Sequence, residues 1–161
     1  MQKPETARVF PLDSAGTGAS VEILNSLLQD QLAVADGFRT ALATGASFVL
    51  DIVPEFYLFE SDHRRAAAEL REEILRLRGR PSRSAGACGA FTESYLKSAS
   101  LFGARTALEA LLESEEHELE ELEEALSKVS PDTRRLLEDR LVPRERKHVE
   151  ALGDILENRF G

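Results

Sequence analysis

The sequence has few residues that could link the chain covalently or bind a metal through sulfur. Among its 161 residues there is one cysteine, Cys88, and there is no tryptophan. One cysteine can form neither a disulfide within the chain nor the full thiolate set of an iron–sulfur cluster. Long hydrophobic runs and a signal-peptide pattern are missing too, since the longest apolar stretch, near residues 46–53, is far shorter than the roughly 18 residues of a membrane span. We therefore expect a soluble, cytoplasmic protein.

Positive charge is also in short supply. The 20 lysine and arginine residues face 29 aspartate and glutamate residues, which gives a net charge of -9. Such a field repels phosphate backbones and anionic lipid headgroups, so we expect neither nucleic acid nor a membrane as a partner. The length and the 42% hydrophobic content suit one domain with one core.

Apolar residues recur every three to four positions in four segments and predict four amphipathic helices. The expected helices cover residues 20–45, 54–78, 105–129 and 131–158, with Ser20 and Ser130 as N-terminal caps. Residues 1–19 have no such period and predict a flexible tail. The long connection from 79 to 103 predicts a crossover with a short helix near residues 91–96. The sequence thus predicts an all-α, four-helix bundle over residues 20–158.

Polar residues interrupt the apolar stripe of every predicted helix at a similar level. Two of the helices repeat a Glu-x-x-His pattern, whose two members lie one turn apart. The other two helices each contribute one polar residue. The predicted inward-facing set is Gln31, Glu60, His63, Glu115, Glu145 and His148.

Three glutamates at one level of a core need a counter-charge, because an unpaired buried carboxylate costs several kcal/mol or more. No lysine or arginine lies centrally on the inner stripes at this level, and Arg144 at the edge is the nearest. A divalent metal ion is therefore the natural counter-ion. Glutamate from two helices and Glu-x-x-His from two others is the ligand set of di-iron and di-manganese bundles. Glu116 replaces Glu115 if the helical register is wrong by one.

The Glu-x-x-His pairs, together with residues 24–28, 36–39 and 94–98, resemble the ferritin-like superfamily, and within it an uncharacterised bacterial branch known only as a domain of unknown function. The resemblance covers residues 20–158. It implies that Glu60, His63, Glu115, Glu145 and His148 bind iron or manganese. It also implies ferroxidase or peroxide-reducing chemistry. Gln31 stands where the superfamily has a carboxylate, so the site could bind either one metal ion or two.

A second hypothesis is a non-catalytic helical bundle that acts through self-association or partner binding. Single core histidines are more often satisfied by a neighbouring carboxylate than by a metal, so a metal-free hydrogen-bonded core stays open. His117 lies off the inner stripe and is expected to be exposed. Pro143 lies inside the last predicted helix and should kink it. The sequence does not decide whether the protein is a homo-oligomer.

Overall fold

The structure is a computed structural model that describes residues 14–43, 52–86 and 101–161, and these residues hold helices and no strand. Its elements, in chain order, are the helices α1 (Ser14–Ala43), α2 (Val53–Arg76), α4 (Ala104–Ala125) and α5 (Pro131–Leu136), the π-helical turn η1 (Leu137–Leu141) and the helix α6 (Val142–Phe160). The run from α5 to α6 is continuous and acts as one long helix. The predicted all-α class and the four helical segments are confirmed.

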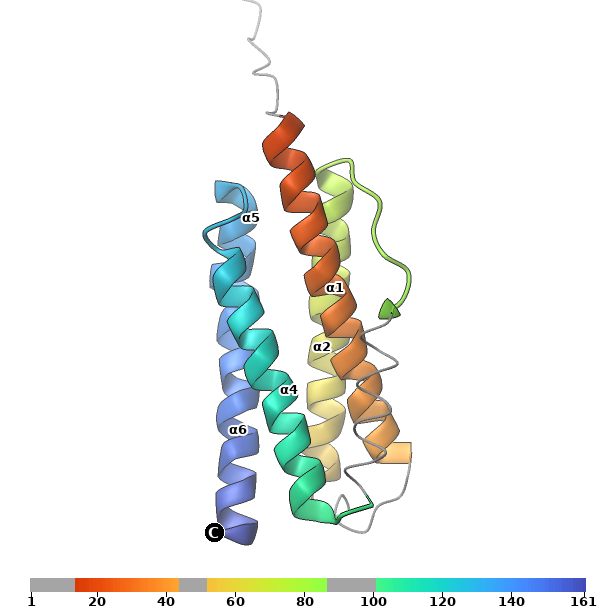
Figure 1. Cartoon of the computed structure of the whole chain (residues 1–161), viewed down its shortest axis with the longest axis vertical. Coiled ribbons are helices and arrows are strands. Elements are labelled where there is room, and N and C mark those ends of the chain that lie inside the picture. Colours follow the sequence, from red (N-terminus) through yellow and green to blue (C-terminus); the bar gives the residue numbers. More distant parts are fainter. Residues whose placement is uncertain (1–13, 44–51, 87–100) are drawn as a thin grey trace, which may run out of the picture.

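The helices pack as two antiparallel pairs. Helix α1 lies along α2, and α4 lies along α6, with a further contact between α1 and α4 (Figure 1). Gly79 follows α2 and lies against Val21 of α1. A Cβ atom there would lie 2.6 Å from a methyl carbon of Val21 on α1, so only glycine fits without a shift.

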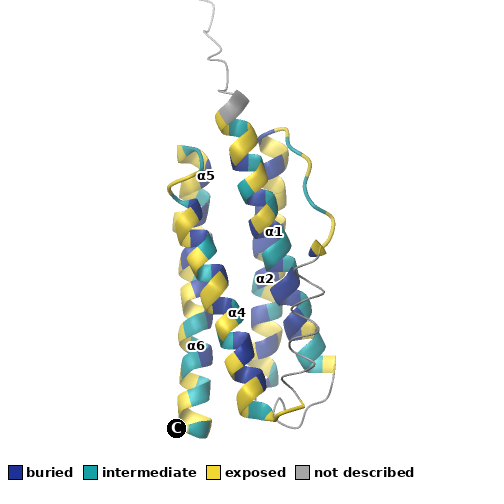
Figure 2. Ribbon diagram, viewed as in Figure 1, coloured by how far each residue is buried: buried dark blue, intermediate teal, exposed yellow. Residues whose placement is uncertain are grey.

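Figure 2 marks the buried residues of the helices in dark blue. The apolar ones among them form two clusters that follow each other along the bundle. The aliphatic cluster contains leucines of every helical segment, among them Leu28, Leu70 and Leu122. The phenylalanine cluster contains Phe38, Phe56 and Phe59 with the leucines around them. The polar residues of the inner faces lie between these two clusters, which both exclude water from that level.

Several predicted boundaries differ from the structure. Helix α1 begins at Ser14, six residues before the expected cap, so residues 14–19 are helical and not part of a tail. Ser20 is buried inside the helix, where its hydroxyl donates to the Gly16 carbonyl and caps nothing. Ser130 does cap α5, since its side chain accepts from the Thr133 amide. Residues 1–13, the predicted crossing helix and Cys88 lie outside the described residues.

The predicted distortion at Pro143 takes the form of a π-helical turn. Proline lacks an amide hydrogen and clashes with the carbonyl four residues earlier. In η1 the Val142 amide donates to Leu137, five residues back, so the backbone widens just before the proline. Pro143 then occupies the first turn of α6, directly after this wider turn of the continuous helix.

Within the described residues, no helix is both long enough and apolar enough to cross a membrane.

Candidate metal centre

A layer of polar side chains separates the two apolar clusters. All of them are less than 4% exposed, although glutamate and histidine are rarely buried to this degree without a partner. Every helical segment of the bundle contributes to this polar layer. Its members are Gln31 on α1, His63 on α2, Glu115 and Glu118 on α4, and Glu145 and His148 on α6.

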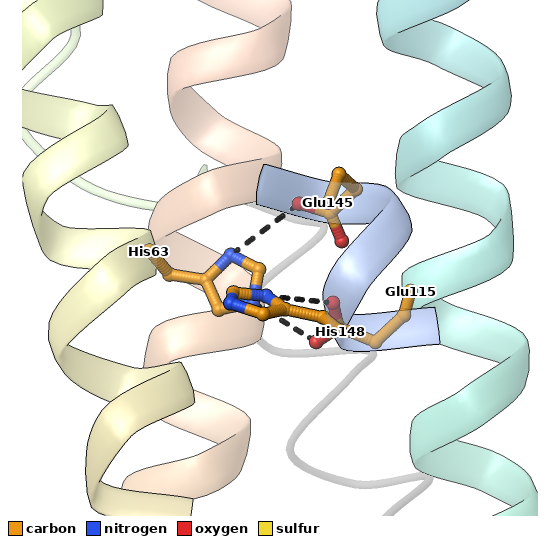
Figure 3. A group of neighbouring side chains, drawn as sticks. All are labelled: His63, Glu115, Glu145 and His148. Carbon is orange, nitrogen blue, oxygen red and sulfur yellow. Dashed lines mark hydrogen bonds and ion pairs between the residues drawn. The ribbon is translucent and has the colours of Figure 1, made fainter. Parts of the chain in front are cut away.

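Four members of the polar layer converge on one point. His63, Glu115, Glu145 and His148 each offer one ligand atom, and these atoms lie within 4.8 Å of one another. Figure 3 shows the four side chains pointing toward each other from three different helices. Two imidazoles and two carboxylates at this spacing are a donor set that could hold a metal ion.

Glu115 lies between the two imidazole rings. Its Oε1 is 2.9 Å from Nε2 of His63, and its Oε2 is 3.4 Å from Nδ1 of His148. The two rings are 5.0 Å apart and meet edge to face. The carboxylate of Glu145 completes the group, with its Oε2 4.0 Å from Nδ1 of His63 (Figure 3).

The two histidines titrate differently. Burial lowers the pKa of His63 from 6.5 to about 4, and the nearby charges of Glu145 and Asp62 recover only part of that shift. Burial also acts to lower the pKa of His148, but the nearby carboxylate of Glu115 outweighs it, so this pKa is raised. At neutral pH His63 is therefore neutral, which is the form that binds a metal.

Two of the glutamates resist ionisation in the metal-free protein. Burial is the main cause that raises the pKa of Glu118 well above its usual value, and the charges of Glu145 and Glu115 add to it. Burial and the neighbouring Glu115 raise the pKa of Glu145 in the same way. Carboxylates crowded in a dry core repel one another, so each holds its proton more tightly.

Many polar atoms of this layer have no hydrogen-bond partner among the described residues. Buried polar atoms in folded proteins are nearly always paired, so such a concentration at one level needs an explanation. The atoms are Gln31 Nε2, Glu115 Oε2, both carboxylate oxygens of Glu118, Glu145 Oε1 and His148 Nδ1. A cation among them would satisfy several oxygens and one imidazole nitrogen at once.

Glu60 does not join the group, contrary to the prediction that it faces inward. Its side chain is 21% exposed and pairs with Arg64, one turn further along α2. Arg64 in turn bonds Asp36 on α1, so these three residues form a charged patch at the rim of the bundle. The structure leaves Glu60 outside the group formed by His63, Glu115, Glu145 and His148.

Gln31 does face inward, and the prediction missed two further acidic residues. The Gln31 Oε1 lies 3.1 Å from Nδ1 of His63, outside the convergent group but in contact with it. Glu118 lies on the same side of His63, with its Oε2 3.8 Å from Nδ1. Asp62 bonds Nε2 of His148 at 3.2 Å. The seven-residue spacing of Leu111, Glu118 and Ala125 would have indicated that Glu118 is buried, whereas Asp62 carries no such signal.

Aromatic rings close one side of the polar layer. Phe38 stacks on His63 with a centroid distance of 5.7 Å and an interplanar angle of 18°. Phe59 lies 4.7 Å from the ring of His148. These contacts fix both imidazoles against the phenylalanine cluster and keep water from their outer faces.

The comparison with known families gives one match. Residues 19–128 match the family described as a domain of unknown function (DUF2383). The match includes His63 and Glu115 and ends before Glu145 and His148. No curated protein and no solved structure matches the chain.

Proposed function

The match covers about two thirds of the chain, so the protein belongs to the DUF2383 family, and we propose that it binds a divalent metal ion through His63, Glu115, Glu145 and His148. One observation carries this proposal. Two imidazoles and two carboxylates from three helices converge within 4.8 Å in a dry layer of the bundle.

We propose iron or manganese as the metal, since the mixed nitrogen and oxygen set accommodates both. Imidazole nitrogen suits iron, copper, nickel and zinc, whereas carboxylate oxygen suits manganese, magnesium and calcium, so a mixed set lies between these preferences. Iron or manganese bound here would supply a redox-active centre for reaction with dioxygen or peroxide. The protein would then act as a ferroxidase or a peroxide reductase with a ferritin-like bundle.

The chain's own residues would prepare such a centre. His63 is neutral at pH 7 and so needs no deprotonation before it binds. Glu115 presents one oxygen toward each imidazole, and one of its oxygens belongs to the convergent group of ligand atoms. The apolar clusters above and below exclude water and strengthen every charge interaction at this level.

The first experiment compares metal content in three proteins. Untagged wild-type protein, Glu115→Gln and Glu116→Gln are loaded anaerobically with Fe(II) or Mn(II), desalted and analysed by mass spectrometry. Glu116 is adjacent to Glu115 on α4 but exposed, so it is a matched control. We expect at least one ion per chain in the wild type and in Glu116→Gln, and a loss in Glu115→Gln. Equal content in all three proteins would exclude this site.

The same experiment measures nuclearity. One ion per chain would agree with the four convergent ligands alone. Two ions per chain would mean that the buried carboxylate of Glu118 binds the second ion. Gln31 would offer that ion only a neutral amide oxygen. Stopped-flow absorbance then tests the chemistry: oxidation of Fe(II) no faster than in buffer would exclude ferroxidase activity.

A metal-free bundle is the second candidate, and one observation favours it. The raised pKa values of Glu118 and Glu145 allow both side chains to be uncharged in the folded protein without any cation. Such a protein would act through self-association or a partner. It would hold no metal after either loading, and its melting temperature would not respond to Fe(II) or Mn(II).

A further inference from the structure

The two histidines of the polar layer differ in which ring nitrogen faces Glu115 and which faces an acceptor outside the convergent group. His148 has Asp62 at its Nε2, 3.2 Å away, while its Nδ1 faces Glu115 Oε2 at 3.4 Å. His63 has the Gln31 oxygen at its Nδ1, 3.1 Å away, and its Nε2 turned toward Glu115. The acceptor outside the convergent group therefore lies at Nε2 in His148 but at Nδ1 in His63.

We propose that Asp62 and Gln31 are positioning residues that fix opposite tautomers of the two histidines. Asp62 accepts the proton of His148 Nε2 and leaves the Nδ1 lone pair for a metal ion. Gln31 accepts the proton of His63 Nδ1 and leaves the Nε2 lone pair. This inference rests on the proposed metal site and assigns Gln31 to orientation instead of coordination.

The physical basis is the single proton of a neutral imidazole. One ring nitrogen donates, the other accepts or coordinates, and the acceptor that holds the proton decides which is which. His63 faces two acceptors, Gln31 Oε1 and Glu115 Oε1, but it has one proton to give. A cation between His63 Nε2 and Glu115 would take the place of the missing second proton. It would bind the Nε2 lone pair and attract the carboxylate at the same time.

Asp62 is suited to this role because its hydrogen bond connects two helices. It lies on α2, directly before His63, yet its bond reaches His148 on α6. Its carboxylate is 17% exposed and sits at the edge of the polar layer, outside the convergent group. A carboxylate behind a histidine ligand holds the ring in place and makes its other nitrogen a stronger donor.

Nuclear magnetic resonance tests the assignment directly. Long-range ¹H–¹⁵N spectra of histidine-labelled protein distinguish protonated, free and metal-bound ring nitrogens, and Zn(II) serves as a diamagnetic probe. In the Zn(II)-loaded wild type we expect a proton on Nδ1 of His63 and on Nε2 of His148, with metal at the other two nitrogens. The same nitrogen coordinating in both rings would overturn the proposal.

Variants separate orientation from folding. We expect Asp62→Ala and Gln31→Leu each to lower Zn(II) affinity by about 10- to 100-fold, the usual range for such supporting residues. Each should disturb the tautomer of its own histidine and leave the other unchanged. Asp62→Asn keeps an oxygen acceptor, so it should recover most of the affinity. Glu60→Gln, on the same helix as Asp62, is the control and should bind as the wild type does.

The outcomes distinguish this inference from the proposed function. Wild-type protein that binds no Zn(II), Fe(II) or Mn(II) would exclude both. Wild-type protein that binds metal, with Asp62→Ala and Gln31→Leu unchanged in affinity and in tautomer, would overturn the positioning roles alone. Circular dichroism and the melting temperature of each variant identify any loss that comes from unfolding.

Discussion

The two Glu-x-x-His pairs have the same spacing but different surroundings. In α6, Glu145 and His148 are both buried and both belong to the convergent group. In α2, His63 is buried but Glu60 lies at the rim and pairs with Arg64. The pattern fixes an angle of about 60° between its two members on a helix, and it does not fix where the core lies relative to them.

Helical position agrees with the inward direction of the buried members of the two pairs. His63 lies seven residues from Phe56 and from Leu70, which are both fully buried, so it lies on the central line of the inner face. Glu145 lies seven residues before the fully buried Leu152. Glu60 is displaced toward the rim, where the arginine one turn later captures its carboxylate.

The largest expected effect is on metal affinity. We expect Glu145→Ala to weaken Mn(II) binding by at least about 100-fold, because it removes a buried ligand. Glu60→Ala should change it by less than about threefold, since this side chain lies outside the group. Isothermal titration calorimetry measures both constants. Equal losses would mean that the two pairs act alike and that α2 turns inward when metal binds.

In the metal-free protein, substitutions in the two pairs should change the free energy of unfolding in opposite directions. Glu145→Leu removes a buried, crowded carboxyl group and should stabilise the fold by about 1–3 kcal/mol, as seen when buried ionic groups are replaced by apolar ones. Glu60→Leu loses only a rim ion pair, which is worth at most about 1 kcal/mol. Urea unfolding in the presence of a chelator gives both values. A destabilised Glu145→Leu would show that its carboxyl group supports the metal-free fold.

The pH dependence of stability should follow Glu145 and Glu118. Both have raised pKa values in the folded protein, so the unfolded chain releases their protons first. Stability of the metal-free protein should therefore fall as the pH rises from about 4.5 toward the raised pKa values. Glu145→Gln should flatten this slope and Glu60→Gln should not, as read from melting temperatures between pH 5 and 8. Saturating Mn(II) should reverse the trend.

The smallest effect is expected from Arg64→Ala, which releases Glu60. An exposed ion pair is worth at most about 1 kcal/mol, so metal affinity should rise by less than about fivefold if Glu60 turns inward. Calorimetry against the wild type detects such a change. Unchanged affinity would mean that the direction of the helix, and not Arg64, keeps Glu60 at the rim.

Much of the polar layer could be predicted from sequence, because its members lie on seven-residue lines of apolar residues. Gln31 lies between Leu24 and Phe38, and Glu115 lies between Leu108 and Leu122, all of them buried. Such lines hold one side of a helix against its neighbours over many turns. They explain why the inward direction of Gln31, His63 and Glu115 was correctly predicted.

Contacts between helices could not be predicted in this way. Nothing in the local sequence indicates that Asp62 reaches His148 across the bundle, since this depends on how α2 and α6 face each other. The same holds for the bond between Glu73 on α2 and Thr133 on α5. The inward direction predicted for Glu60 was wrong. Glu60 pairs with Arg64, which also bonds Asp36 on α1, and this contact between two helices could not be read from the local sequence.

The sequence by itself determined the four helical segments and the level at which polar residues interrupt their apolar faces, because these follow from helical periodicity along one chain. The tertiary structure decided which polar atoms meet. It brought Glu115 between two imidazoles, left Glu60 at the rim and gave each histidine a different outer acceptor. The reason is that periodicity sets a direction around each helix, whereas a site needs distances between helices, and packing alone fixes those.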